Sequence, residues 1–167
     1  MDLGLTDRVV MVSGASRGLG YAIAQRLLAE GARVSIASSN SGAIERAAAE
    51  LGGDAARLLA CSCDVRSRSA IDAWRDQTLA TFGAVHGLVV NAGGPPPGAF
   101  DDFDDEAWQG AFELTLLSSI RMIRAVLPSM RRQGGGSIVT LTSSSVKEPI
   151  PSLLLSNVMR SGVTSLA

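Results

Sequence analysis

The sequence of 167 residues is poor in the residue types that most often carry acid–base or metal chemistry. It contains one histidine, one tyrosine and two cysteines, and aromatic residues make up only 4% of the chain. A lone His86 is interpreted as a strand-edge residue rather than a ligand or base. Cys61 and Cys63 lie two apart on a predicted strand. We expect them to point to opposite faces, to be buried and inert, and to form neither a disulfide nor a metal site.

A surplus of positive charge and a long apolar run are also missing. The net charge of −1 gives no basic footprint of the kind that binds nucleic acid. No apolar run approaches the roughly eighteen residues of a membrane span, and the first ten residues, MDLGLTDRVV, lack the layout of a secretion signal. We therefore expect a cytoplasmic protein without a nucleic-acid or membrane partner. A hydrophobic content of 46% predicts a single globular domain over residues 1–167.

Short apolar runs alternate with longer helical patterns along the chain. The runs predict strands at 9–13, 33–38, 57–62, 86–91 and 137–142, and the patterns between them predict helices at 19–30, 41–51, 69–82 and 105–132. Strands that are apolar on both faces and joined by helices indicate a parallel sheet covered on both sides. The fold class is therefore α/β, a doubly wound Rossmann sheet.

Three glycines lie between the first predicted strand and the first predicted helix, at Gly14, Gly18 and Gly20. Glycine lets the backbone turn tightly there, approach a ligand and pack the helix against the sheet. The free N–H groups at the start of the helix attract phosphate. In this strand–turn–helix setting, the glycines predict a nucleotide phosphate site.

At these motifs the sequence resembles the classical short-chain dehydrogenase/reductase family. The matching segments are SGASRGLG (13–20), CDV (63–65), NAGG (91–94) and GSIVTLTSS (136–144). The resemblance implies a strand order of 3-2-1-4-5 and a bound nicotinamide dinucleotide. It implies that the pyrophosphate and ribose meet Gly14, Ser16, Arg17, Gly18 and Leu19, that the adenine meets Asp64 and Val65, and that Asn91, Ala92 and Gly93 lie along the cofactor.

The end of the second strand bears on the choice of cofactor. It carries Ser39 and Asn40 and no carboxylate that would accept hydrogen bonds from an adenosine ribose. Arg17 in the glycine turn is placed to reach a phosphate. We therefore favour NADP(H), and NAD(H) stays possible.

The catalytic positions implied by the family are altered in this sequence. The serine of the family falls on Ser143, whereas the tyrosine falls on Ser156, the lysine on Arg160 and the asparagine on Thr115. Ser156 and Arg160 are four residues apart, so they share a face of a predicted helix. A serine hydroxyl is far less acidic than a phenol, and arginine does not release its proton.

Three interpretations of these positions stay open. In the first, Arg160 stabilises a developing alkoxide, Ser143 holds the carbonyl and water relays a proton through Ser156. In the second, the protein only binds nucleotide. In the third, Ser156 and Arg160 have purely structural roles at the start of a helix. Lys147 and Glu148, in the following loop, are alternative acids that are more simply interpreted as solvated charges. Ser156 and Arg160, together with GGPPPG (93–98), resemble an atypical branch of the family, which favours the active enzyme.

The family domain normally extends further, with two more strands and a substrate lid. We expect the chain to be C-terminally incomplete relative to the family and the strand at 137–142 to form a bare sheet edge. The resemblance also implies a small carbonyl or alcohol substrate, of the 3-oxoacyl-reductase type in a loose sense. It implies a homodimer or homotetramer formed through the helix at 105–132 and the helix of Ser156.

Overall fold

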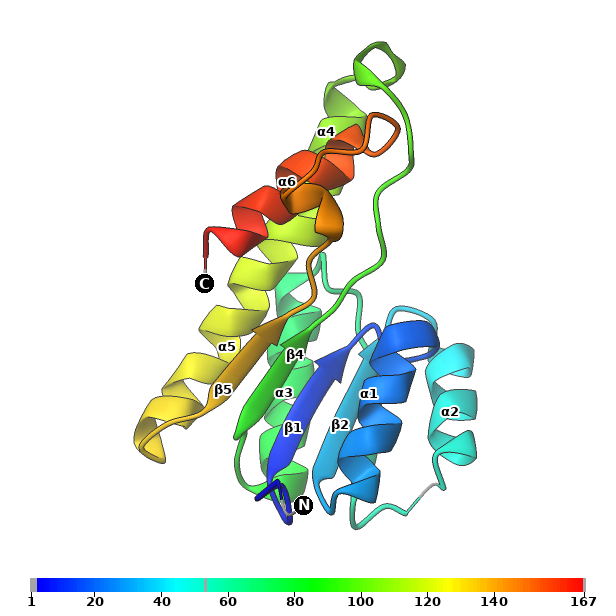
Figure 1. Ribbon diagram of the computed structural model, residues 1–167. Coiled ribbons are helices and arrows are strands. Elements are labelled where there is room, and N and C mark those ends of the chain that lie inside the picture. Colours follow the sequence, from blue (N-terminus) through cyan, green and yellow to red (C-terminus); the bar gives the residue numbers. More distant parts are fainter. Residues whose placement is uncertain (1–2, 53, 167) are drawn as a thin grey trace.

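The computed structural model describes residues 3–52 and 54–166, and its centre is a five-stranded parallel sheet (Figure 1). The strands are β1 (Val9–Ser13), β2 (Arg33–Ser38), β3 (Leu58–Ser62), β4 (Gly87–Val90) and β5 (Ser137–Thr140). Their order in the sheet is β3-β2-β1-β4-β5, which confirms the predicted doubly wound α/β fold. The order reverses between β1 and β4, so a crevice opens beyond the carboxyl ends of these two strands.

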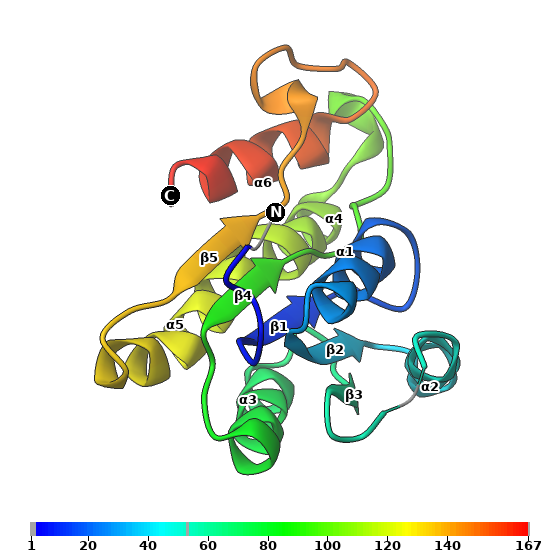
Figure 2. The ribbon, with the colours of Figure 1, turned by 60° about the horizontal axis from the view of Figure 1, so that its bottom comes forward.

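Helices cover both faces of the sheet (Figures 1 and 2). The elements are α1 (Gly18–Ala29), α2 (Ser41–Glu50), α3 (Arg68–Phe82), α4 (Asp105–Ala111), α5 (Ser118–Arg132) and α6 (Leu154–Thr164), with 3-10 turns η1 (Phe100–Asp102) and η3 (Ser144–Val146) and a π-helical segment η2 (Phe112–Leu117). Helices α1 and α2 lie on one face, and α3 and α5 lie on the other. Helix α6 packs against α4, η2 and η3.

Two apolar clusters form the core of the sheet because the central strands β1, β2 and β4 are buried on both sides. Met11 of β1 packs into the cluster beneath α3 and α5, and its neighbour Val12 packs into the cluster beneath α1 and α2. Burial of side chains of this size contributes about 1.5–3 kcal/mol each. Trp74 of α3 is 1% exposed, and its indole Nε1 donates to the buried Ser35 Oγ at 2.8 Å, so this polar group is satisfied.

The prediction that Cys61 and Cys63 face opposite sides is wrong. Both side chains pack into the cluster beneath α3 and α5, because residues two apart along an extended segment share a face. Both thiols are free, and burial raises the pKa of each to about 11. In the described part of the chain, no group of three or more His, Cys, Asp or Glu side chains is placed to hold a metal ion.

The helix predicted over 105–132 is confirmed as a continuous helical run, but its middle is π-helical rather than α-helical. The π-helical segment η2 separates α4 from α5. Ser118 Oγ donates to the carbonyl oxygen of Leu114 at 2.6 Å, and Ser119 Oγ donates to that of Thr115 at 2.6 Å. Hydroxyls that bond to carbonyls one turn back loosen the regular backbone ladder, and π-segments occur often at functional sites.

Strand β5 is an edge of the sheet, as predicted. Val139 at its centre is 55% exposed, and β4 is its partner on one side. Over residues 3–52 and 54–166, none of the helices combines the length and apolarity that crossing a membrane requires.

His86 directly precedes β4, and its imidazole accepts a hydrogen bond at Nδ1 from the backbone N–H of Val9 at 2.9 Å. This contact confirms a structural role at the start of β4. Burial, and then the nearby charge of Arg8, lower the pKa of His86.

The lowered pKa of His86 predicts that stability decreases with acidification. The unfolded chain keeps the ordinary histidine pKa of about 6.5, so it binds the proton before the folded chain does. We expect the urea concentration at the unfolding midpoint to decrease as the pH is lowered from about 7.5 to about 5.5. The decrease should be smaller in His86→Asn. Asparagine keeps an acceptor for Val9 but does not titrate. An equal pH dependence of both proteins would contradict this assignment.

Candidate functional site

The turn between β1 and α1 is built on three glycines. Gly14 and Gly18 have φ angles of +60° and +59°, in the left-handed region where a side chain is strained. A Cβ atom at Gly20 would overlap the carbonyl oxygen of Gly14 and lie 2.9 Å from Asn91 Nδ2. Arg17 precedes α1 without a side-chain cap, which leaves the first amide groups of the helix available to an anion.

Asn91 and Ser13 fix this turn to the end of β4. Asn91 Nδ2 donates to the carbonyl oxygens of Gly14 at 3.1 Å and Ser13 at 3.3 Å. Ser13 Oγ donates to the carbonyl oxygen of Asn91 at 2.7 Å, and the Asn91 N–H donates back to Ser13 Oγ at 2.9 Å. Asn91 was predicted to lie along the cofactor, and Ser13 was not among the predicted site residues. These contacts make both residues supports of the glycine turn.

A cleft of about 400 Å³ opens beyond the carboxyl ends of the strands. It brings together the predicted residues Gly14, Ser16, Arg17, Ser39, Asp64, Val65, Asn91, Ala92 and Gly93. The other lining residues were not among the predicted site residues: Ser38, Cys63, Arg66 and Leu114. Gly18 and Leu19 do not line this cleft or the second hollow described next, and the Leu19 side chain is 68% exposed.

A second hollow of about 490 Å³ adjoins the cleft and shares Ser16, Arg17, Ser38 and Ser39 with it. Asn40 and Arg46 also line this hollow. Asn40 Oδ1 caps α2 by accepting from the N–H of Ala43 at 2.9 Å. The Arg46 guanidinium lies back along α2, 3.5 Å from where a Cβ of Gly42 would be. Arg46 was not among the predicted site residues, because its place beside the hollow depends on how α2 packs.

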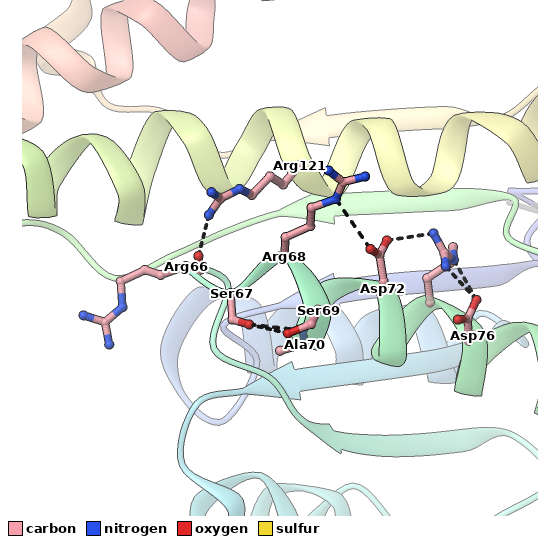
Figure 3. Close-up of polar contacts among 9 residues, drawn as sticks. Arg66, Ser67, Arg68, Ser69, Ala70, Asp72, Asp76 and Arg121 are labelled. Atoms are coloured by element: carbon pink, nitrogen blue, oxygen red, sulfur yellow. Dashed lines mark hydrogen bonds and ion pairs between the residues drawn. The ribbon is translucent and has the colours of Figure 1, made fainter.

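The loop after β3 is held by two arginines. Arg66 binds the Asp64 carboxylate through Nη2 at 2.7 Å and Nε at 3.1 Å, and these hydrogen bonds lower the pKa of Asp64. Arg121 of α5 donates to the carbonyl oxygen of Arg66, as Figure 3 shows. The carboxylate of Asp64 is thus engaged within the loop, and residues 63–66 line the cleft.

Ser143, Ser156 and Arg160 lie near the carboxyl end of β5. Arg160 Nε donates to Ser156 Oγ at 3.1 Å, so the two side chains meet as their helical spacing predicts. Arg160 Nη1 donates to the carbonyl oxygen of Leu141 at 2.9 Å. Ser143 Oγ accepts from the N–H of Ser145 at 3.1 Å at the start of η3.

Arg160 carries a positive charge near the carboxyl end of β5 that no ion pair neutralises among the described residues. No carboxylate of the described residues forms an ion pair with it, and burial lowers the pKa of its guanidinium, which stays charged at neutral pH. The alternative acids Lys147 and Glu148 are exposed and form no hydrogen bond or ion pair with Ser143, Ser156 or Arg160 within the part of the chain described above. This agrees with solvated loop charges.

Three buried polar atoms in the same region have no hydrogen-bond partner among the described residues: Thr115 Oγ1, Ser145 Oγ and Asn157 Oδ1. They belong to η2, η3 and α6, and α6 packs against both of the other elements. Thr115 is the residue on which the resemblance places the asparagine of the family. The region therefore combines a cation, several hydroxyls and unsatisfied polar atoms.

The parallel sheet, the glycine turn and the cleft at the carboxyl ends of the strands define a nucleotide-binding Rossmann domain. The particular family follows from the match of residues 8–155 to the model described as short chain dehydrogenase. The chain belongs to the short-chain dehydrogenase family.

Known relatives agree with this assignment. The chain is 31% identical over 167 residues to dehydrogenase/reductase SDR family member 4 of Bos taurus, covering 97% of this chain and 58% of the relative. It is 32% identical over 142 residues to the 7alpha-hydroxysteroid dehydrogenase of Escherichia coli K12, covering 85% and 55%. The chain therefore spans about three fifths of the length of the curated relatives that it matches.

A solved structure is similar as well. L-sorbose reductase from Gluconobacter frateurii, complexed with NADPH and L-sorbose, superposes with a TM-score of 0.94 at 29% identity. The match covers 99% of this chain and 64% of that chain.

The close contact at Gly20 predicts that one added methyl group lowers the stability of the protein strongly. In Gly20→Ala the new Cβ would overlap the backbone of Gly14, and the turn would have to move. We expect a loss of about 1–3 kcal/mol in the free energy of unfolding, measured in urea. Gly110→Ala is the control, because a Cβ at Gly110 meets no atom within 4 Å. Equal stability of Gly20→Ala and the parent protein would refute the close approach.

Proposed function

We propose that the protein is an NADP(H)-dependent oxidoreductase that transfers a hydride between nicotinamide and a carbonyl or alcohol substrate. The observation that carries the proposal is the pairing of an uncapped helix start behind the glycine turn with a hollow that Arg17 and Arg46 line beside the end of β2. Glu50 also lines that hollow, but from the far end of α2. The small-molecule substrate would be a ketone of the 3-oxoacyl type in a loose sense.

The residues of the cleft fit such a cofactor. Gly14, Ser16, Gly18 and Leu19 would place backbone N–H groups near the pyrophosphate, with Arg17 as its counter-charge. Asp64 and Val65 would meet the adenine, and Asn91, Ala92 and Gly93 would lie along the middle of the molecule.

The end of β2 favours a 2′-phosphate. Ser39 and Asn40 offer neutral donors, Arg17 and Arg46 offer charge, and no carboxylate follows β2 directly. The related L-sorbose reductase binds NADPH, and the related 7 alpha-hydroxysteroid dehydrogenase was solved with NADH at a TM-score of 0.91 and 28% identity. NAD(H) is therefore the second candidate.

The bound dinucleotide would supply the hydride, and this chain would supply charge and proton handling. The guanidinium of Arg160 would stabilise negative charge on the substrate oxygen in a half-buried site, where charges interact more strongly than in water. Ser143 would hold the same oxygen by a hydrogen bond. Arg160 keeps its own protons, so the proton would come from water through Ser156, to which Arg160 already donates.

A specific observation supports the alternative of a nucleotide-binding protein without catalysis. The guanidinium of Arg160 already donates to Ser156 Oγ and to the Leu141 carbonyl oxygen, and these bonds tie α6 to the end of β5. A purely structural arginine would make the same contacts. The experiment on Arg160 below separates the two functions.

We also propose that the protein is cytoplasmic and forms a homodimer or homotetramer through α5 and α6. Val158 on α6 is 47% exposed, which suits a helix that meets a second copy.

The choice of cofactor can be tested at Ser39. In Ser39→Asp a carboxylate would repel a 2′-phosphate and accept hydrogen bonds from a ribose 2′-hydroxyl. We expect the preference for NADPH over NADH, measured as the ratio of dissociation constants by fluorescence titration, to fall by at least about 10-fold. Ser41→Asp adds the same charge outside the hollow and should leave the ratio nearly unchanged. An unaltered ratio in Ser39→Asp would argue against NADP(H).

The proposed chemistry can be tested at Arg160. In Arg160→Ala the charge at the substrate oxygen is lost, and we expect kcat to fall by about 100-fold or more. The dissociation constant of NADPH should change by less than about 2-fold, because the phosphate contacts lie elsewhere. Arg160→Lys keeps the charge without the planar fork and should be intermediate. Turnover would be followed as NADPH oxidation with a ketose, an oxosteroid and a 3-oxoacyl thioester. Equal kcat in the parent protein and Arg160→Ala would favour the structural role.

A further inference from the structure

We propose that Gly98 is a positioning residue, through which the proline-rich segment 95–98 caps α6 and fixes Ser156 and Arg160. The sequence GGPPPG departs from the general composition of the chain, and the cofactor site does not account for its three prolines. The consequence for catalysis rests on the proposed function, whereas the capping contact does not.

Helix α6 begins without a side-chain cap. Leu153 occupies the cap position, and its side chain carries no acceptor for the first backbone N–H groups of the helix. Gly98 supplies one acceptor from a distant part of the chain, because its carbonyl oxygen accepts from the N–H of Leu154 at 3.4 Å. The Gly98 N–H donates to the carbonyl oxygen of Ser152 at 2.7 Å. Gly98 and Leu153 thus form a short parallel bridge that ties the two segments together.

The space at Gly98 is closed on its other side. A Cβ atom there would lie 2.5 Å from Phe103 Cζ and 3.1 Å from Asp102 Oδ2. Phe103 in turn packs against the apolar cluster that contains Leu155 and Met159 of α6. Gly98 does not have a positive φ angle, so available space rather than backbone conformation decides which residue fits.

Both of the joined segments are stiffened by proline. Five of the six prolines of the sequence lie in them, namely Pro95, Pro96, Pro97, Pro149 and Pro151. Proline fixes φ and lowers the entropy that is lost when a loop becomes ordered. Asn157 holds the second segment from the helix side, since its Nδ2 donates to the carbonyl oxygen of Ile150 at 2.8 Å.

The position of the first turn of α6 sets the position of the reacting side chains. Ser156 lies in that turn, and Arg160 follows one turn later on the same face. A displacement of Leu154 would move the guanidinium of Arg160 relative to the Leu141 carbonyl oxygen, which lies at the end of β5. Displacements of about 1 Å are sufficient to reduce turnover strongly.

Gly98→Ala tests the proposal, and Gly94→Ala is its matched control. Gly94 lies in the same segment, also lacks a positive φ, and a Cβ there meets no atom within 4 Å. In Gly98→Ala we expect backbone N–H exchange at 154–157 to become about 10-fold faster, and kcat to fall by about 10-fold with the NADPH dissociation constant unchanged. Gly94→Ala should match the parent protein in all three measurements.

A second variant covers the case in which Gly98→Ala folds poorly. Leucine at position 103 removes the ring atoms that the new Cβ would meet, so Gly98→Ala with Phe103→Leu should recover the exchange rate and kcat of Phe103→Leu alone. Unchanged exchange at 154–157 in Gly98→Ala would overturn the proposal, as would faster exchange with unchanged kcat. If the parent protein reduces no ketone, the proposed function fails, and the exchange measurement still decides whether Gly98 caps α6.

Discussion

The hydrogen bonds between Asn91 and the glycine turn are the constraint on which the nucleotide cleft depends. Asn91 binds the Gly14 carbonyl oxygen and exchanges hydrogen bonds with Ser13, so the ends of β1 and β4 are held together where the sheet order reverses. Gly20 lets α1 approach this point, because a methyl group there would meet Gly14 and Asn91. Without these contacts, the start of α1 would not be held at a fixed position beside the crevice of the twisted sheet.

A second set of contacts joins the π-helical segment η2 to α6. Leu114 of η2 lines the cleft, and the next residue, Thr115, is buried with its hydroxyl unpartnered among the described residues. Helix α6 packs against η2 and carries Ser156 and Arg160. The π-segment therefore contacts both the cleft and α6, so a change of helical register in η2 would affect both.

Much of the fold could be predicted from the sequence because parallel strands buried on both faces leave continuous apolar runs. The runs at 9–13 and 33–38 match β1 and β2, and the glycine turn follows β1 as expected. The spacing of Ser156 and Arg160 also sufficed, since residues four apart in one helix must share a face. Contacts within one element, or directly between consecutive elements, can be predicted from the local sequence.

Other features could not be predicted, either because helical periodicity is blind to them or because they depend on contacts between distant elements. Hydrogen bonds of the Ser118 and Ser119 hydroxyls accompany the π-segment, and helical periodicity does not report them. The bond from Arg160 to the Leu141 carbonyl oxygen depends on how α6 docks beside β5. Arg46 is an ordinary helix residue until α2 is placed beside the glycine turn.

In the proposed mechanism Arg160 takes the place of the family's lysine, and this has a physical consequence for the site. A half-buried lysine can lose its proton when desolvation is strong, whereas arginine stays charged at any pH that keeps the protein folded. Arginine can therefore hold two fixed acceptors, Ser156 Oγ and the Leu141 carbonyl oxygen, and still present positive charge to a third. In that mechanism a proton would travel through a hydroxyl or water, which would make the position of α6 more important than it is where a tyrosine donates directly. The external cap at Gly98 meets that requirement from outside the cofactor cleft.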